Sequence, residues 1–194
     1  MPSTMIHLMT AHELEQEVST LFWVGNFAPD YTNDRELKDK IHLRVSDDRW
    51  GELKTLRDKI DMENPFERGW FLHLFIDACW DEHELMEYKS YAESFGNAEN
   101  WFSGYRNEIG LATYYLYHHL PWAKQVWDLI KNADLSMINT SLPISQSDAG
   151  WYRDRVVARH FESEANIKPE FFTYDKILNF SQNTAARYKA WLME

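Results

Sequence analysis

The longest apolar stretch of the chain, residues 69–80 with the sequence GWFLHLFIDACW, is hydrophobic around its whole circumference rather than along one face. An α-helix with this pattern lies inside a protein core. Asn64 and Pro65 precede the stretch, and a Pro in the first turn is typical of a helix start. The pattern predicts a helix from residue 65 to about residue 91, open to a break, with a central buried part at about 66–82.

Apolar residues recur at helical spacing on both sides of this helix. The segments with this spacing are residues 5–20, 48–61, 101–120, 121–135 and 174–192, with a mixed segment at 150–165. Residues 22–30 contain Gly25 and Pro29, which disfavour a continuous helix. The polar residues 31–48 predict an excursion from the core, and residues 136–150 predict an exposed loop.

The length and composition of the chain fit one packed domain. Its 194 residues suit a single hydrophobic core. Hydrophobic residues make up 44% and aromatic residues 15% of the chain, with only seven Gly and six Pro, which favours helices joined by few sharp turns. We therefore predict an all-α fold. A single domain over residues 1–194 would form a multi-helix bundle around the central buried helix.

The formal net charge of −11 disfavours an extended nucleic-acid surface, because such surfaces bind phosphates through clustered Lys and Arg. Bound metal ions can still attract one phosphate group to an acidic protein. No segment reaches roughly eighteen consecutive apolar residues, and the N-terminus lacks the basic and apolar regions of a secretion signal. We expect a cytoplasmic protein without a transmembrane segment. The lone Cys79 predicts a buried thiol without an internal disulfide.

Two ionisable side chains, His73 and Asp77, lie within the apolar stretch, four residues apart and so on one face of its helix. A buried carboxylate is costly unless it is hydrogen-bonded, paired or metal-bound. Two interpretations are open: hydrogen bonds within an ordinary core, or shared coordination of a metal ion. Three more candidates inside or beside apolar segments favour the metal, namely His7, Asp30 and His42. Histidine nitrogens and aspartate oxygens suit zinc, and also iron or manganese.

In this order, the five residues resemble the ligands of the zinc-dependent phospholipase C family and of the related single-strand-specific zinc nucleases. That family has an N-terminal His, an Asp on an early loop, a His after an excursion, and HxxxD on a central helix. The resemblance extends to about residue 85. The family also has a second His six residues beyond the Asp of HxxxD, where this chain has His83, so the resemblance makes His83 a sixth candidate ligand.

The resemblance implies a site of one to three zinc ions and the hydrolysis of phosphoester bonds by metal-activated water. It implies that Asp77 bridges ions, and that His7, His42 and His73 hold them. Asp30 would be a ligand and the catalytic residue that orients or deprotonates the water. The implied substrate is a small phosphoester or a phospholipid.

The chain departs from this family in two respects. The family has a His and an acidic residue four apart on a later helix, but residues 97–125 contain no such pair. The nearest substitutes are Glu108, His118, His119, and the pair His160 and Glu164, whose spacing also fits a surface pair. Secreted members use a processed N-terminal amine as a ligand, so removal of Met1 would make the Pro2 amine a candidate. These departures leave open a non-catalytic helical metal-binding protein with an incomplete site, and a metal-free helical bundle.

Overall fold

The computed structural model of the chain describes residues 1–14, 19–164 and 168–194. Over these ranges it consists of α-helices and short 3-10 helices without a strand, which confirms the predicted all-α fold. The elements are α1 (Thr4–Leu14), α2 (Thr20–Gly25), η1 (Ala28–Asp30), α3 (Arg35–Ile41), α4 (Arg49–Arg57), α5 (Pro65–Glu82), α6 (Glu84–Ser94), α7 (Trp101–His119), α8 (Ala123–Lys131), η2 (Leu135–Met137), α9 (Gln146–Phe161) and α10 (Tyr174–Trp191).

Helix α5 is the predicted central helix. Its N-terminus is capped by Asn64, whose side-chain oxygen accepts two backbone N–H groups of the first turn. Every residue from 69 to 80 is buried. The helix ends at Glu82, because the backbone of His83, with φ −121° and ψ −69°, leaves helical angles. The break that the sequence allows is therefore at His83, and α6 starts directly after it.

Helices α2 and α5 approach to backbone contact through two glycines. A Cβ on Gly69 would collide with the carbonyl oxygen of Phe22, and a Cβ on Gly25 would collide with that of Phe66. Only glycine permits so close an approach at these positions. The contact places Asn26, the residue after α2, against α5, where its Nδ2 donates to the carbonyl oxygen of Gly69 at 3.4 Å.

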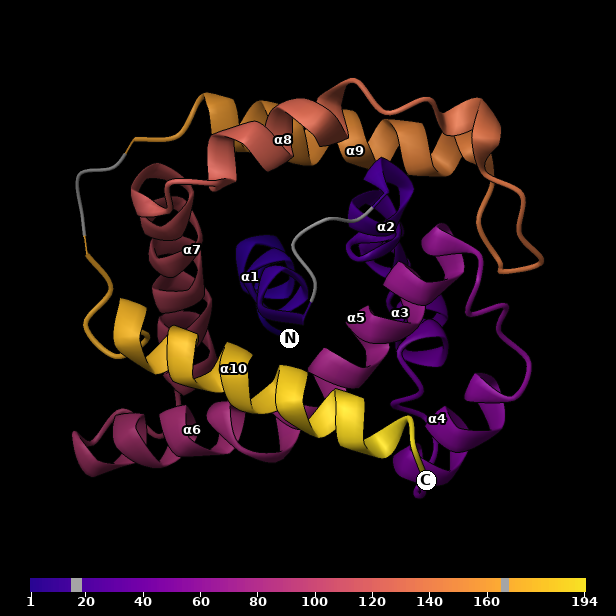
Figure 1. Cartoon of the computed structure of the whole chain (residues 1–194). Helices are drawn as coiled ribbons and strands as arrows, with labels where there is room; N and C mark the ends of the chain where they lie inside the picture. The colour runs from indigo at the N-terminus through magenta and orange to yellow at the C-terminus, as the bar shows by residue number, and fades with distance from the viewer. Residues whose placement is uncertain (15–18, 165–167) are drawn as a thin grey trace.

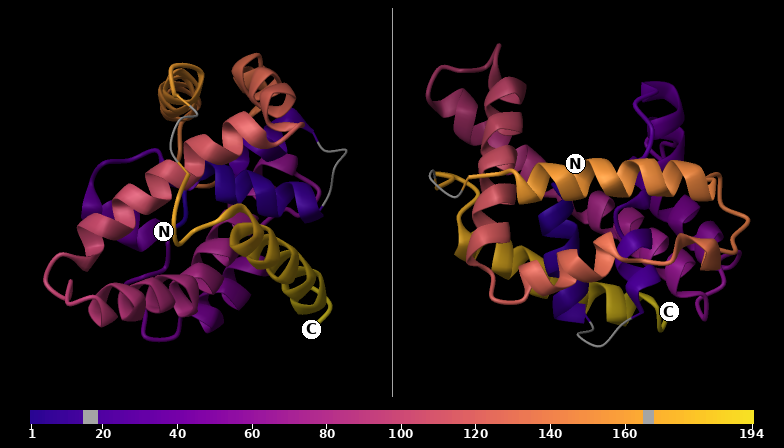
Figure 2. Two further views of the ribbon diagram at one scale, coloured as in Figure 1. Left: turned by 90° about the vertical axis from the view of Figure 1, so that its left-hand side faces the viewer. Right: turned by 90° about the horizontal axis from the view of Figure 1, so that it is seen from above.

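Helix α1 is enclosed as fully as α5. Its residues 5–11 are all buried, and it lies between α5, α7, α8 and α10 (Figure 1). Helices α8 and α9 run side by side along one edge of the molecule, and α9 also packs on η1 (Figure 2). Two buried helices therefore share the core, whereas the sequence pattern indicates only α5.

The segments before α5 that lack helical periodicity contain two short helices, α2 and α3, which the sequence pattern does not predict. Helix α2 begins where the side chain of Ser19 accepts a backbone N–H. Helix α3 lies inside the polar residues 31–48, and Asp34 caps it by accepting the N–H of Leu37 at 3.1 Å. Caps and tertiary packing stabilise such short helices, and periodic apolar residues are not needed.

Other boundaries differ by a few residues. Helix α9 begins at Gln146 rather than at about residue 150, because Ser145 and Asp148 form a capping box. The expected loop at 136–150 is therefore shorter than predicted. Helix α1 is described up to Leu14, and residues 15–18 of the predicted first helix lie outside the described residues. Among the helices of the described ranges, none has the length and apolar character needed to cross a membrane.

Candidate metal centre

The structure brings together five of the six predicted metal ligands, which we call the His/Asp cluster. Helix α1 supplies His7, η1 ends with Asp30, His42 follows α3, and α5 supplies His73 and Asp77. The three histidines and Asp77 are fully buried, and the side chain of Asp30 is 10% exposed.

Two overlapping sets of side chains in the cluster could each hold a metal ion: His7, His73 and Asp77, and Asp30, His42 and His73. Nε2 of His42 lies 3.1 Å from Nε2 of His73 and 3.3 Å from Oδ1 of Asp30, and Nε2 of His7 lies 3.4 Å from Oδ1 of Asp77. Ligand atoms at about 2.0–2.1 Å from a tetrahedral zinc ion are roughly 3.3 Å apart. The observed separations fit such an ion.

Hydrogen bonds to backbone carbonyls orient two of the histidine rings. Nδ1 of His73 donates to the carbonyl oxygen of Asn26 at 2.9 Å, and Nδ1 of His42 donates to that of Lys38 at 2.7 Å. Because a carbonyl oxygen only accepts, the proton of each neutral ring is on Nδ1 and the lone pair is on Nε2. Two lone pairs that face each other at 3.1 Å repel, so a proton or cation beside both is needed to stabilise them.

The two carboxylate oxygens of Asp77 face different partners. Oδ1 lies near His7, while Oδ2 lies 3.6 Å from Nε2 of His42 and 3.1 Å from Nη2 of Arg44. Burial opposes ionisation, but the contacts with His7 and Arg44 outweigh it and hold the pKa of Asp77 well below its usual range. In the described part of the chain, neither nitrogen of His7 nor Oδ1 of Asp77 has a hydrogen-bond partner. These three buried atoms are available to a metal ion.

Asp30 and His73 also have the protonation states that metal binding requires. Burial opposes the charge on Asp30, but His42 and the ammonium of Lys38, 2.6 Å away, lower the pKa of this carboxyl below its usual range. Burial and the neighbouring His7 lower the pKa of His73 well below its usual value. Ionised carboxylates and neutral imidazoles are the forms that bind metal ions.

Three further charged residues border the cluster, and none of them was among the candidates from the sequence. Asp81 lies one turn after Asp77 on α5, and its Oδ2 accepts hydrogen bonds from Arg44 at 2.7 Å and from Arg49 at 2.9 Å. The spacing of Asp81 from Asp77 is a usable signal, because it places both on one helix face. Arg44 lies in the polar segment 31–48 and Arg49 begins α4, and neither has a distinguishing pattern in the sequence. The amino group of Met1 lies 3.6 Å from Oδ1 of Asp81, so the N-terminal residues reach this edge of the cluster.

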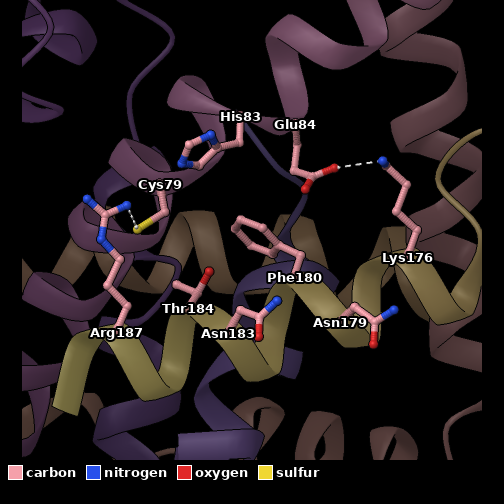
Figure 3. A pocket seen from close by; sticks show the side chains of 9 residues that line it. All are labelled: Cys79, His83, Glu84, Lys176, Asn179, Phe180, Asn183, Thr184 and Arg187. Atoms are coloured by element: carbon pink, nitrogen blue, oxygen red, sulfur yellow. Dashed lines mark hydrogen bonds and ion pairs between the residues drawn. The ribbon is translucent and has the colours of Figure 1, made fainter. Parts of the chain in front are cut away.

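The structure does not bring His83, the sixth predicted ligand, to the cluster. Six residues correspond to about one and two-thirds helical turns, so this position does not share the face of Asp77. The side chain of His83 is 70% exposed and lines a separate cavity of about 670 Å³ beside α10 (Figure 3). Cys79 lines the same cavity, and its thiol is buried as predicted, 3.6 Å from Nη1 of Arg187.

The candidates in the second half of the chain have other partners. The carboxylate of Glu108 accepts backbone N–H groups of residues 170–172. His118 and His119 each bond to a backbone carbonyl oxygen. His160, expected in a surface pair, is instead buried. None of these side chains belongs to a potential metal-ligand group within the described residues.

Comparison with protein-family models, curated proteins and solved structures found no match to this chain. The resemblance to phospholipase C rests on the five ligands and their order. The geometry of the His/Asp cluster is therefore the basis for a functional assignment.

Proposed function

We propose that the protein is a metal-dependent hydrolase of phosphoester bonds, with a metal centre similar to that of zinc-dependent phospholipase C. The observation that carries the proposal is the pair of ligand sets that overlap at His73. Nδ1 of His73 is engaged by a backbone carbonyl, so the ring offers one nitrogen to one ion. We assign that ion to Asp30, His42 and His73. Asp77 and His7 would hold a second ion beside it, because the two oxygens of Asp77 face different histidines.

Metal ions in such a centre lower the pKa of a bound water and neutralise phosphoryl oxygens. The nitrogen-rich ligand set favours zinc, with iron or manganese as alternatives. Asp30 is the one partly exposed member of the cluster, so its side chain can meet a water molecule. His42 and Lys38 keep this carboxylate ionised against the effect of burial. A strongly ionised carboxylate is a weak proton acceptor, so we assign Asp30 to orienting the water rather than deprotonating it.

The proposed substrate is a small phosphoester or a phospholipid. The net charge of −11 repels long polyanions, whereas metal ions attract a single phosphate group. Burial of the cluster also requires the reacting phosphate to enter at one edge rather than lie across an open surface.

A second candidate function is a non-catalytic metal-binding protein with an incomplete site. The engagement of Glu108 by backbone N–H groups favours it, because the best substitute for the missing late acid is already bonded elsewhere. In this reading the metal stabilises the fold and no phosphoester is hydrolysed.

Metal content and turnover of the same preparation test the two functions. The protein is purified without added metal, its ions are counted by elemental analysis, and hydrolysis of p-nitrophenyl phosphate and bis(p-nitrophenyl) phosphate is followed. Asp77→Asn removes the proposed bridging carboxylate. Asp58→Asn is the matched control, because the Asp58 side chain is 72% exposed and, among the described residues, forms an ion pair with Arg57 alone.

We expect at least two bound ions and phosphoester turnover that Asp77→Asn abolishes and Asp58→Asn leaves unchanged. A single ion without turnover on either ester would support the non-catalytic function. A protein that purifies without metal and does not take up zinc would contradict both.

A further inference from the structure

Cationic side chains border the exposed edge of the His/Asp cluster. The cluster itself is buried, so a ligand can reach it only beside its exposed neighbours. Arg44 is 23% exposed and Arg49 15%, and we call these two residues the arginine pair. Nη2 of Arg44 donates to Oδ2 of Asp77 at 3.1 Å, so the arginine pair lies between the buried cluster and the protein surface.

One carboxylate oxygen bonds to both members of the arginine pair, and Nη1 of Arg49 also donates to the backbone carbonyl oxygen of Asp77 at 3.5 Å. Oδ2 of Asp81 accepts from Nε and Nη2 of Arg44 at 3.0 and 2.7 Å, and from Nη1 of Arg49 at 2.9 Å. Nε and Nη2 of Arg49 are buried and have no hydrogen-bond partner in the described part of the chain. Nη2 of Arg49 lies 4.0 Å from Oδ2 of Asp77, which is too far for a hydrogen bond. Buried donors of this kind are normally satisfied, and an anion would satisfy them.

The charge of the site also indicates an anionic ligand. Without metal, the three carboxylates of Asp30, Asp77 and Asp81 are balanced by Lys38 and the arginine pair, and the amino group of Met1 also lies beside Asp81. Each divalent ion that the neutral histidines help to hold adds two uncompensated positive charges. The metal-loaded site is therefore positive inside an otherwise acidic protein, and its field attracts an anion to the exposed edge.

We propose that the arginine pair binds the terminal phosphate of a phosphomonoester, next to the metal ions. This inference rests on the proposed function, because the ions supply the excess positive charge. A terminal phosphate presents three oxygens and close to two negative charges, whereas a phosphodiester presents two free oxygens and one charge. Two guanidinium groups and a metal ion therefore match the terminal phosphate better. Arginine is suited to the role, because its planar fork bonds two phosphate oxygens at once. The free fork here is Nε and Nη2 of Arg49, whereas Nε and Nη2 of Arg44 already donate to Asp81.

Calorimetric titration with inorganic phosphate tests the site without relying on turnover. Metal-loaded wild-type protein is compared with Arg44→Gln, Arg49→Gln and Arg49→Lys, and the metal content of each variant is measured. Arg35→Gln is the matched control, since Arg35 is 96% exposed and pairs only with Asp39 among the described residues. Arg49→Lys keeps the charge but loses the fork, so it tests the site even if a Gln variant does not fold.

We expect Arg44→Gln and Arg49→Gln to weaken phosphate binding by at least about tenfold, because each loses hydrogen bonds to a charged ligand. Arg49→Lys should bind more weakly than wild type, and Arg35→Gln should bind equally well. Methyl phosphate should also bind more tightly than dimethyl phosphate. Unchanged phosphate affinity in the metal-loaded arginine variants, or equal affinity for the two methyl esters, would overturn the inference.

The outcome also separates this inference from the proposed function. Phosphate binding that depends on the arginine pair, in a protein that hydrolyses no phosphoester, would remove the hydrolase and leave the phosphate site. Turnover together with phosphate binding that does not depend on the arginine pair would remove the phosphate site and leave the hydrolase.

Discussion

Two buried titratable side chains outside the His/Asp cluster, His160 and Cys79, have pKa values shifted by their surroundings. The His160 ring stacks on Trp127 with ring centroids 4.0 Å apart, and Nδ1 donates to the carbonyl oxygen of Val156 at 2.7 Å. Burial lowers the pKa of His160 from 6.5 to about 4. The unfolded chain therefore protonates this ring near pH 6.5, while the folded protein keeps it neutral until about pH 4.

We expect His160 to make the protein less stable in acid. Between pH 6.5 and 4 the unfolded state binds one more proton at His160, so the free energy of unfolding falls as the pH falls. The full effect is roughly 3 kcal/mol, at about 1.4 kcal/mol per pKa unit. Urea unfolding of chelator-treated protein at neutral and acidic pH measures it. His160→Gln should flatten the pH dependence, whereas the exposed His83→Gln should not; equal curves for wild type and His160→Gln would contradict the assignment.

The thiol of Cys79 should be unreactive in the folded protein. Burial raises the pKa of Cys79 to about 12 and outweighs the nearby Arg187, so the reactive thiolate is scarce at pH 8. We expect no labelling by a disulfide reagent in native buffer and one labelled thiol per chain in urea. Rapid labelling of the native protein would instead show that the neighbouring cavity exposes the sulfur.

At the scale of the elements, the contact between α2 and α5 depends on a residue without a side chain. A methyl group at position 69 would collide with the carbonyl oxygen of Phe22, so Gly69→Ala must separate the two helices. Overpacking of this kind costs about 1–3 kcal/mol. The shift should also move Asn26 away from His73 and reduce metal content. Denaturant unfolding and elemental analysis measure the two effects.

Gly110→Ala on α7 is the matched control, because a Cβ at this helical position would meet nothing within 4 Å. It should stabilise the protein by up to about 1 kcal/mol through helix propensity and leave the metal content unchanged. Equal stabilities of the two variants would show that α2 and α5 are not held at backbone contact.

The elements that the sequence predicts well are those with a continuous apolar signal. Helix α5 is evident from residues 69–80 and from Asn64 and Pro65 before it. Helix α3 is not, because it is short and polar, and it exposes most of its surface. Its Asp34 cap is visible in the sequence, but a single capping residue is too common to locate a helix.

The five residues of the His/Asp cluster could be selected from the sequence as candidate ligands because each is a polar residue in or beside an apolar segment. The arginine pair could not be predicted, since arginines in a polar segment or at a helix start are usually solvated, and only the fold places these two beside Asp81. His83 was predicted by family spacing, and the structure places it in the separate cavity at the end of α5.

At the scale of the whole molecule, the His/Asp cluster joins segments that contribute little packing of their own. Helix α3 has one buried residue, Ile41, and η1 has three residues in all. A metal ion bound by Asp30, His42 and His73 would tie both segments to α5. The metal would therefore act as a cross-link between the buried helices and the N-terminal polar excursion.

Removal of metal should lower the melting temperature of the protein. An ion that binds only the folded state adds RT ln(1 + [L]/Kd), about 2.7 kcal/mol at a hundred times Kd. We expect a chelator to lower Tm and added zinc to restore it in wild type and in Asp58→Asn. In Asp77→Asn, Tm should respond little to either treatment, because the bridging carboxylate is lost. A wild-type Tm that does not change with the chelator, with Asp77→Asn tolerated, would identify a metal-free bundle in which neighbouring side chains such as Arg44 compensate the charge of Asp77.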